Sequence, residues 1–290
     1  QTLQAIKIIT PPAEGTLRLN GVQVVVDQEI SLADLQAGAL TYQGRADYFG
    51  LDQFRWTGSD GIAFASTPVF TNINLANVND GPRMADLGDA NGVEGNFFSQ
   101  AITLADPDPE GHRITVDWGD GSPLQVYNVG NQANHSIGHN YLDNGSYQVS
   151  VTVDDQQGQA NSVQVDSFTV VVANAAPTLS LFGNANVVQG EPYTISLSSV
   201  FDTGADTVTQ YRINWGDGTP EQVINAAELP ANRQLQHTYT SLGAQSISVT
   251  LVDEDGSFAN AGTRSVTVTP PAEVLTVDAG VDRTVNEGTT

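Results

Sequence analysis

The sequence repeats itself at a spacing of about 95 residues, and this repeat limits the possible folds more than any other feature. The tetrad Trp-Gly-Asp-Gly at residues 118–121 returns at residues 215–218. Further markers return in the same order: His-x-Tyr at 139–141 and 237–239, Val-Glu-Gly and Val-Gln-Gly at 93–95 and 188–190, and Val-Asn-Glu-Gly at 285–288. Several markers that recur in one order at a fixed period indicate tandem copies of one structural unit.

The repeat also predicts domain boundaries. A chain of 290 residues is long enough for two or three domains. We expect units at residues 1–80, 81–174 and 175–271, and the first strand of a further unit at 272–290. The junctions are short and contain prolines at positions 82, 177, 270 and 271. Because proline restricts the backbone, these junctions favour stiff joints over flexible tethers.

Alternating apolar and polar residues predict strands along nearly the whole chain. Residues 147–153 place Tyr and three Val on one face and polar residues on the other, and residues 246–251 repeat the pattern. Helical periodicity is confined to short turns near residues 32–35 and 226–229. Many short strands between Gly, Asp and Asn turns predict an all-β fold of tandem Ig-like Greek-key β-sandwiches in an extended rod.

The repeated tetrad has a mechanical meaning in such a fold. Trp118 and Trp215 each end an inward-facing alternation, so we expect both indoles to fill a sandwich core. The Asp-Gly that follows provides the positive φ angles of a tight turn. We expect the Tyr of His-x-Tyr to pack nearby at the start of a later strand, with its hydroxyl bonded to the backbone.

Units two and three resemble PKD (polycystic kidney disease) domains. The second unit carries Val-Asp-Trp-Gly-Asp-Gly, His-Asn-Tyr and Gly-Ser-Tyr-Gln-Val-Ser-Val-Thr-Val-Asp-Asp, and the third carries Ile-Asn-Trp-Gly-Asp-Gly, His-Thr-Tyr and Ser-Ile-Ser-Val-Thr-Leu-Val-Asp. The resemblance covers both units almost from end to end. The third unit departs from the family pattern at residues 243–245, where Gly-Ala-Gln replaces the usual Gly-x-Tyr.

The first unit resembles the cadherin-like repeats of large bacterial surface proteins. The motifs that carry this resemblance are Gly-Thr-Leu-Arg-Leu-Asn-Gly at 15–21, Gly-Ala-Leu-Thr-Tyr at 38–42, Phe-Gly-Leu-Asp-Gln-Phe at 49–54, Ser-Asp-Gly at 59–61 and Val-Asn-Asp at 78–80. The unit looks truncated at its N-terminal side. Together the two resemblances imply an Ig-like sandwich array in a long extracellular stalk, an adhesin or an appendage of a secreted enzyme.

Composition narrows the classes of partner. The chain has 33 acidic and 10 basic residues and a formal net charge of −23. Such a surface disfavours nucleic acids and anionic membranes, which require clustered Lys and Arg, and it favours divalent cations as counter-ions. The absence of Cys removes disulfides, thiolate metal sites and cysteine nucleophiles. No apolar run is long enough to span a membrane, and we expect targeting segments to lie outside this piece.

Acidic loops near the predicted boundaries are the candidate metal sites. The run Asp-Pro-Asp-Pro-Glu at 106–110 follows a predicted strand at 101–104 and places several oxygens in one loop. Calcium binds six to eight carboxylate, carbonyl and water oxygens, which a loop and an adjacent linker can provide together. The alternative is that these acids are solvated turn residues. The predicted calcium ligands are Asn79, Asp80, Glu94, Asp106, Asp108, Asn174, Glu191, Asp202 and Asp206.

The remaining acids and histidines are interpreted as structural. Asp154 and Asp155, like residues 253–255, occupy hairpins where acids commonly form turns, although a ligand role is the alternative. Asp120 and Asp217 are predicted to form turns. His139 and His237 occupy a repeated slot that packing or a hydrogen bond explains.

No motif predicts catalysis. The chain lacks a helical His-x-x-x-His pair and a Gly-x-Ser-x-Gly elbow, and its Gly-Asp-Gly segments lack the βαβ context of a phosphate site. A pair of glycosidase carboxylates has no such sequence signature, but nothing marks a cleft. The sequence therefore predicts a protein that is not an enzyme.

The predicted function is a calcium-stiffened spacer or stalk in a large bacterial surface or secreted protein, at an extracellular or cell-surface location. The alternative function is a set of accessory modules of a secreted hydrolase that bind polysaccharide or protein. Contact between neighbouring copies is a third possibility. The expected partners are calcium and, beyond it, neighbouring copies, cell-surface glycans or matrix, with no nucleic acid and no membrane insertion.

Overall fold

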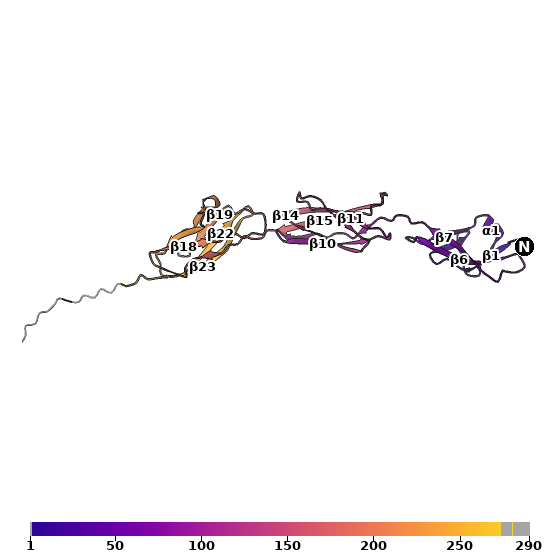
Figure 1. The fold of residues 1–290 in the computed structure, drawn as a ribbon, viewed down its shortest axis with the longest axis horizontal. Coiled ribbons are helices and arrows are strands. Elements are labelled where there is room, and N and C mark those ends of the chain that lie inside the picture. The colour runs from indigo at the N-terminus through magenta and orange to yellow at the C-terminus, as the bar shows by residue number, and fades with distance from the viewer. Residues whose placement is uncertain (1, 274–279, 281–290) are drawn as a thin grey trace, which may run out of the picture. The chain divides into compact units, whose positions relative to one another are not determined.

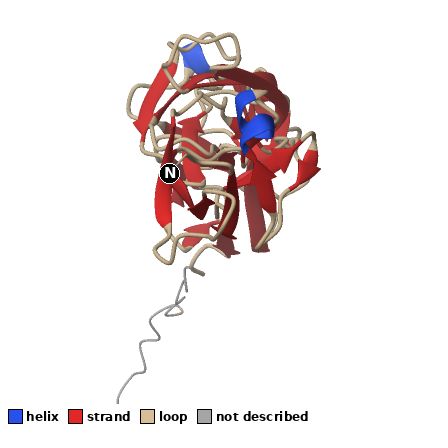
Figure 2. Cartoon of the chain, turned by 90° about the vertical axis from the view of Figure 1, so that its right-hand side faces the viewer, coloured by secondary structure: helices blue, strands red, loops and turns tan. Residues whose placement is uncertain are grey.

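The computed structural model describes residues 2–273 and residue 280. Strands form nearly all of the regular structure, as Figure 1 and the red arrows of Figure 2 show. The two short helical segments, α1 (Leu32–Gln36) and a 3-10 turn at Ala226–Glu228, lie where the sequence predicted them. No helix within the described residues has the length and apolar character needed to cross a bilayer. The predicted strand of a further unit, at 272–290, lies almost wholly outside the described residues.

The first β-sandwich packs a four-stranded sheet, in the order β4-β1-β6-β7, against a three-stranded sheet in the order β3-β2-β5. The buried core between the sheets consists of Ile6, Ile8, Leu17, Val24, Ile30 and Phe54. The strands are β1 (Ala5–Thr10), β2 (Gly15–Leu19), β3 (Val22–Gln23), β4 (Glu29–Ser31), β5 (Leu40–Gly44), β6 (Gly50–Ser59) and β7 (Val69–Leu75).

The second sandwich has sheets in the orders β13-β10-β8 and β12-β11-β14-β15-β9. Its strands are β8 (Arg83–Met84), β9 (Ala90–Val93), β10 (Phe97–Ala105), β11 (His112–Asp117), β12 (Gln125–Val129), β13 (Asn134–Asn140), β14 (Gly145–Asp154) and β15 (Val163–Ala173).

The third sandwich has sheets in the orders β16-β18-β21 and β17-β23-β22-β19-β20. Its strands are β16 (Leu181–Phe182), β17 (Asn186–Val188), β18 (Pro192–Leu197), β19 (Gln210–Asn214), β20 (Gln222–Asn225), β21 (Gln234–Thr238), β22 (Gly243–Val252) and β23 (Ser257–Thr269).

The second and third sandwiches have the same topology, strand for strand. In both, a short edge strand pairs in parallel with the last long strand, β9 with β15 and β17 with β23. In both, the indole nitrogen of the tetrad Trp donates to a glutamine seven residues later, from Trp118 to Gln125 and from Trp215 to Gln222. The all-β class, the tandem Ig-like sandwiches and the repeat of one unit are therefore confirmed.

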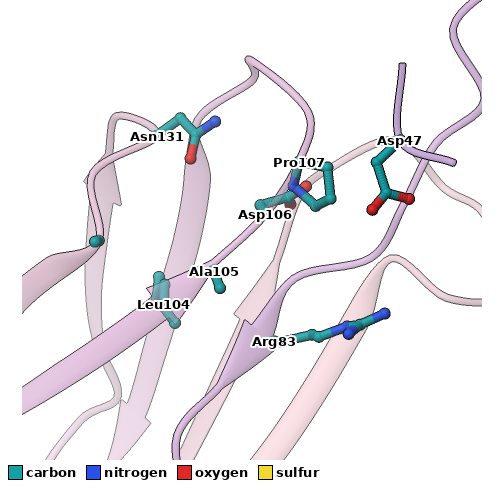
Figure 3. A pocket seen from close by; sticks show the side chains of 8 residues that line it. Asp47, Arg83, Leu104, Ala105, Asp106, Pro107 and Asn131 are labelled. Carbon is teal, nitrogen blue, oxygen red and sulfur yellow. The ribbon is translucent and has the colours of Figure 1, made fainter. Parts of the chain in front are cut away.

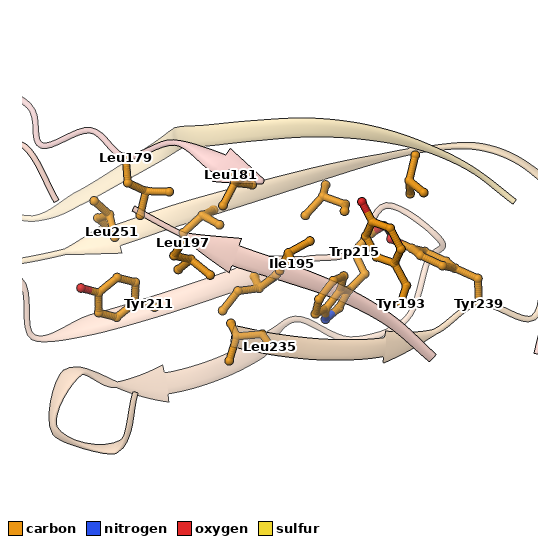
Figure 4. Close-up of a cluster of buried hydrophobic side chains, with 14 of the residues drawn as sticks. Leu179, Leu181, Tyr193, Ile195, Leu197, Tyr211, Trp215, Leu235, Tyr239 and Leu251 are labelled. Carbon is orange, nitrogen blue, oxygen red and sulfur yellow. The ribbon is translucent and has the colours of Figure 1, made fainter. Parts of the chain in front are cut away.

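The repeated aromatic residues form the core, as predicted. Trp118 is fully buried and Trp215 is 2% exposed. Figure 4 shows Trp215, Tyr193 and Tyr239 side by side among the aliphatic side chains of the third core. The Tyr239 hydroxyl donates to the Trp215 carbonyl at 3.1 Å, although Tyr239 directly follows β21 rather than starting a strand. The hydroxyl therefore ties the end of β21 to the tetrad turn.

The turn after Trp215 requires its glycines. Gly216 and Gly218 both have φ 83°, in the left-handed region that glycine adopts without strain. A Cβ on Gly216 would also collide with the backbone of Ser246 on β22. The Asp-Gly tetrad is thus a turn motif in the third sandwich, as the sequence predicted.

A buried histidine–aspartate pair supports this turn. His237 stacks on Trp215 with ring centroids 4.8 Å apart, and its Nε2 lies 2.7 Å from Asp217 Oδ2. Burial alone would raise the pKa of Asp217, but hydrogen bonds from Thr219 and His237 lower it to about 2. His237 therefore has the structural role predicted for it, and Asp217 does more than form the turn.

Contacts divide the described chain into two compact units. The first holds residues up to 89, 99–137 and 147–169, and the second holds 90–98, 138–146 and the chain from 170 onward. The division runs through the second sandwich, so each unit includes part of it.

Replacing Ile195 with Ala should destabilise the third sandwich by about 2–5 kcal/mol, because the side chain is fully buried and its removal leaves a cavity. The matched control Val223→Ala, at a position 54% exposed, should cost less than about 0.5 kcal/mol. Differential scanning calorimetry should show one transition moving to lower temperature in the Ile195→Ala variant. Equal shifts in the two variants would contradict the assignment of this core.

The Asp217 carboxylate should stabilise the third sandwich only while it is ionised. Because the pKa of Asp217 is lower in the folded than in the unfolded state, its contribution is full above pH 4 and is lost as the pH falls towards 2. The contribution is about 2 kcal/mol. Urea unfolding at several pH values should therefore show a difference between the parent and Asp217→Asn that shrinks in acid, and a constant difference would refute this role.

Two acidic clusters as candidate metal centres

Acidic side chains gather at two places in the described chain. The first acidic cluster comprises Asp106, Glu110 and Asp155, whose ligand oxygens all lie within 4.8 Å of one another. Asp106 and Glu110 lie in the loop between β10 and β11, and Asp155 directly follows β14. Strand pairing explains the meeting, because Arg113 at the start of β11 lies opposite Asp154 at the end of β14.

The first acidic cluster contains many of its own hydrogen-bond donors. Asp106 Oδ2 lies 2.9 Å from His112 Nε2, with both side chains fully buried. Asp108 is 2% exposed, and its Oδ2 accepts from the backbone N–H of Asp80 at 2.6 Å. Asp155 Oδ2 accepts from Asn79 Nδ2 at 2.9 Å. The linker residues before β8 are thereby joined to the cluster.

One oxygen of this cluster remains without a donor. Glu110 Oε1 is buried and has no hydrogen-bond partner. Burial and the charges of Asp108 and Asp106 raise the pKa of Glu110. A bound cation would remove this cost, and Glu110 is the side chain of the first cluster that most requires one.

A cavity of about 500 Å³ borders the first cluster (Figure 3). Asp47, from the turn between β5 and β6, lines it together with Arg83 and Asp106. Partial burial and the negative charges of Asp47 and Asp108 raise the pKa of Asp80. The negative potential at this cavity therefore includes Asp47, a residue that sequence reasoning did not identify.

The second acidic cluster contains two overlapping sets of carboxylates. In each set the ligand oxygens lie within 4.8 Å of one another, and Asp206 belongs to both. The loops after β9, after β13 and after β18 and the turn between β22 and β23 provide them. The first set is Glu94, Asp143, Asp206 and Asp255, and the second set is Asp202, Asp206 and Asp253.

Glu94 is the most deeply buried carboxylate of the second cluster. It is 0% exposed, and its Oε1 accepts from the backbone N–H of Ala175 at 2.7 Å. Its Oε2 has no partner. A buried carboxylate oxygen without a donor is unfavourable, so a bound cation would stabilise this atom.

The other members show the same lack of donors. Asp253 is 7% exposed, and its Oδ1 accepts the turn N–H groups of Asp255 and Gly256 while its Oδ2 has no partner. Burial and the adjacent Glu94 carboxylate raise the pKa of Asp206 to about 7. Further buried oxygens without a partner are Asp202 Oδ2, Asp206 Oδ2 and Asn174 Oδ1.

The chemistry of these ligands selects the kind of metal. The second cluster offers carboxylate and amide oxygens from several loops. Hard cations bind such oxygens, and calcium accepts six to eight of them in variable geometry, whereas magnesium requires a strict octahedron. Zinc prefers nitrogen and sulfur ligands. The residues present therefore fit calcium.

The structure brings together most of the predicted ligands. Glu94, Asp106, Asp202 and Asp206 lie within the clusters. Four of the remaining five border the clusters through hydrogen bonds: Asn79 and Asn174 donate to Asp155 and Asp255, the Asp108 N–H donates to Asp106, and the Asp80 N–H donates to Asp108. Glu191 is different, because it is exposed in the turn between β17 and β18 and belongs to neither cluster. We do not retain it as a ligand.

Several cluster residues had been interpreted as turn acids, with a ligand role as the alternative. Asp155 and Asp253 do form turns through Oδ1, which accepts the turn N–H groups. The Oδ2 of Asp155 accepts from Asn79, whereas the Oδ2 of Asp253 has no partner. Strand pairing could have revealed their position, since Gln210 beside the loop after β18 lies opposite Val252. The other cluster acids that were not predicted are Glu110, Asp143 and Asp255.

Comparison with known proteins identifies one domain. The family model of the PKD domain matches residues 79–170, which include the first acidic cluster together with Glu94 and Asp143. No curated protein matches the chain. The PKD resemblance of residues 175–271 and the cadherin-like resemblance of residues 1–80 stay predictions.

Solved structures with similar folds include PKD and adhesin domains. The PKD domain of an M14-like peptidase from Thermoplasmatales archaeon SCGC AB-540-F20 is 20% identical with a TM-score of 0.26, covering 33% of this chain and 98% of that one. A structure of a 1.5-MDa bacterial ice-binding adhesin is 16% identical with a TM-score of 0.27, covering 94% and 88%. A tetra-tandem repeat from the extending region of a large adhesion protein is 14% identical with a TM-score of 0.33, covering 93% and 68%. The chain thus contains a PKD domain at residues 79–170 within a series of tandem Ig-like β-sandwiches.

Proposed function

We propose that this chain is a non-catalytic, extracellular spacer segment of a larger surface or secreted protein, and that calcium bound at the two acidic clusters stiffens its joints. The observation that carries the proposal is the group of buried carboxylate oxygens without donors, above all Glu94 Oε2. These oxygens lie beside linkers, where a bound ion acts on the connection between domains rather than on a substrate.

Hydrogen bonds attach the linkers to the clusters. Asn79 donates to Asp155, and Asn174 Nδ2 donates to Asp255 Oδ2 at 2.9 Å. Ala175, the next residue, donates its N–H to Glu94. Without a cation, repulsion among the carboxylates opposes this arrangement, and a divalent ion replaces that repulsion with attraction. Calcium would therefore hold the linker backbone in place.

Further hydrogen bonds join the loop after β18 to the segments after β9 and β13, all within the second compact unit. The Ala205 N–H donates to the Leu142 carbonyl at 2.7 Å, and Thr203 Oγ1 donates to the Glu94 carbonyl at 3.4 Å. Gly95 has φ 68°, and a Cβ there would collide with the Thr203 carbonyl. The loop after β18 thus packs closely on the segment after β9. This close packing supports the proposal that a bound ion stiffens the joint.

The histidine–carboxylate pairs do not support catalysis. His112 and Asp106 are both fully buried, and the His237 side chain is 16% exposed and stacked on Trp215. Neither pair offers a proton-transfer group to a substrate in solution. This geometry supports a mechanical role for the framework that the second and third sandwiches share.

The accessibility of the second cluster supports an extracellular location. Asp143 and Asp255 are exposed, so the cluster is open to solvent on one side. Calcium sites of extracellular modules are typically weak, with dissociation constants of about 0.1–1 mM. A partly open site matches the calcium supply outside cells better than that of the cytosol.

A second candidate function is ligand binding by the first sandwich. A cavity of about 330 Å³ is lined by Tyr48, Arg55 and Phe70, and the Arg55 guanidinium lies 5.1 Å from the Phe70 ring centre. An aromatic ring beside a cation can bind a polar ligand such as a sugar acid. Binding on a glycan array would favour this candidate. Trp118 and Trp215 add nothing to it, because both rings are buried and cannot stack on a sugar.

Calcium should raise the melting temperature of the chain, because it binds the folded clusters and not the unfolded chain. The rise should be smaller in Glu94→Gln, which removes the charge of a buried ligand, and unchanged in the control Glu191→Gln, an exposed acid outside both clusters. Calorimetry in calcium and in chelator measures both shifts. Equal melting temperatures of the parent in the two conditions would defeat the calcium proposal.

Calcium should also narrow the range of joint angles. Small-angle X-ray scattering of the full chain should show a larger and better-defined maximum dimension in calcium than in chelator. Unchanged scattering together with measurable calcium binding would mean that the ions stabilise the loops without stiffening the joints.

A further inference from the structure

We infer that the second acidic cluster binds two calcium ions that share the Asp206 carboxylate, rather than a single ion. The inference rests on the proposed function and makes it specific in stoichiometry. It follows from the division of the cluster into two sets of ligand atoms with one residue in common.

The distances between ligand atoms allow one ion to be bound within each set. Oxygens that bind one calcium lie about 2.3–2.6 Å from it, so they are at most about 5 Å apart. The ligand atoms satisfy this condition within the set Glu94, Asp143, Asp206 and Asp255, and again within the set Asp202, Asp206 and Asp253. The six acids together do not form one such group. Two centres with a bridging Asp206 account for all of them.

Each set contains its own buried oxygen without a donor. In the first set this is Oε2 of Glu94, which is 0% exposed, and in the second it is Oδ2 of Asp253, which is 7% exposed. Asp206 Oδ2, between them, also has no partner. A single ion near Glu94 would leave the Asp253 oxygen uncompensated, and the reverse holds for an ion near Asp253.

The charge of the cluster supports the same count. Six carboxylates carry a formal charge of about −6, so one calcium leaves about −4 and two leave about −2. Carboxylate oxygens that lie within 4.8 Å of one another repel when they are ionised and no cation is bound. A second ion reduces this repulsion where it is greatest, at the shared residue.

The two centres differ in origin. Asp202, Asp206 and Asp253 all belong to the loop after β18 and the turn between β22 and β23, so the third sandwich provides this set alone. The other set also needs Glu94 and Asp143 from the PKD domain. The ion at Asp253 should therefore persist when Glu94 is changed, and only the ion at Glu94 should depend on the PKD domain.

Native mass spectrometry of the full chain in calcium acetate should count the bound ions. Relative to the parent, Glu94→Gln and Asp253→Asn should each lose one calcium, and Asp206→Asn should lose two. The control Glu191→Gln should lose none. If Asp206→Asn, Glu94→Gln and Asp253→Asn all lose one ion and no more, the cluster holds a single ion and the inference is overturned, while the proposed function stands. If the parent binds no calcium, the proposed function itself fails.

A measurement in chelator separates ligand loss from misfolding. Asp206→Asn removes a charge that repels its neighbours, so without calcium its melting temperature should equal or exceed that of the parent. In calcium the order should reverse, because the parent binds two more ions. A variant that melts below the parent in both conditions would show a purely structural role for Asp206 and would overturn the bridging role.

Discussion

The joint at the second acidic cluster depends on one buried side chain. Glu94 lies wholly inside the protein, with one oxygen held by the N–H of the linker residue Ala175 and the other facing carboxylates. An ionised oxygen in such a place is unfavourable, and a bound cation would stabilise it. The surrounding loops place carboxylate oxygens, rather than apolar groups, beside Glu94. This arrangement suits a cation. A cation bound at this carboxylate, as proposed, would therefore act directly on the geometry of the linker.

The two acidic clusters are built from the same parts, as expected from a repeated fold. Each cluster combines a linker Asn with the loop after β10 or β18 and the turn after β14 or β22. Each also has an acid in a turn nearby, Asp47 before β6 for the first cluster and Asp143 before β14 for the second. They differ in how many of their oxygens accept hydrogen bonds from the protein. His112 and backbone N–H groups occupy much of the first cluster, whereas the second leaves five buried oxygens without partners. The second cluster should therefore depend more strongly on calcium.

Much of the fold could be predicted from local pattern. The alternation along residues 147–153 and 246–251 correctly predicted β14 and β22, and the position of each tetrad Trp at the end of an alternation predicted its burial. These predictions succeeded because a sandwich strand needs one apolar face wherever it occurs. The acidic loops of the two clusters were also predicted, since acids beside a predicted strand end must lie at the end of a sandwich.

The predictions of individual ligands were less complete. Glu191 was predicted as the counterpart of Glu94 in the third unit, but it lies exposed in the turn after β17. Asp155, Asp253 and Asp255 were interpreted as turn residues because local chemistry explains them fully. An acid can form a turn with one oxygen and bind a metal with the other, and sequence spacing alone does not distinguish these uses.

The sequence by itself determined the period, the strands, the core aromatics and the excess of negative charge, because each of these depends on neighbours within a few residues or on composition. The tertiary structure decided which carboxylates meet. Asp143 and Asp255 lie more than a hundred residues apart in the chain, and only the packing of the loops places their oxygens within reach of one ion. The tertiary structure also decided which acids are buried, because Glu94 differs from an exposed Glu only in the residues around it.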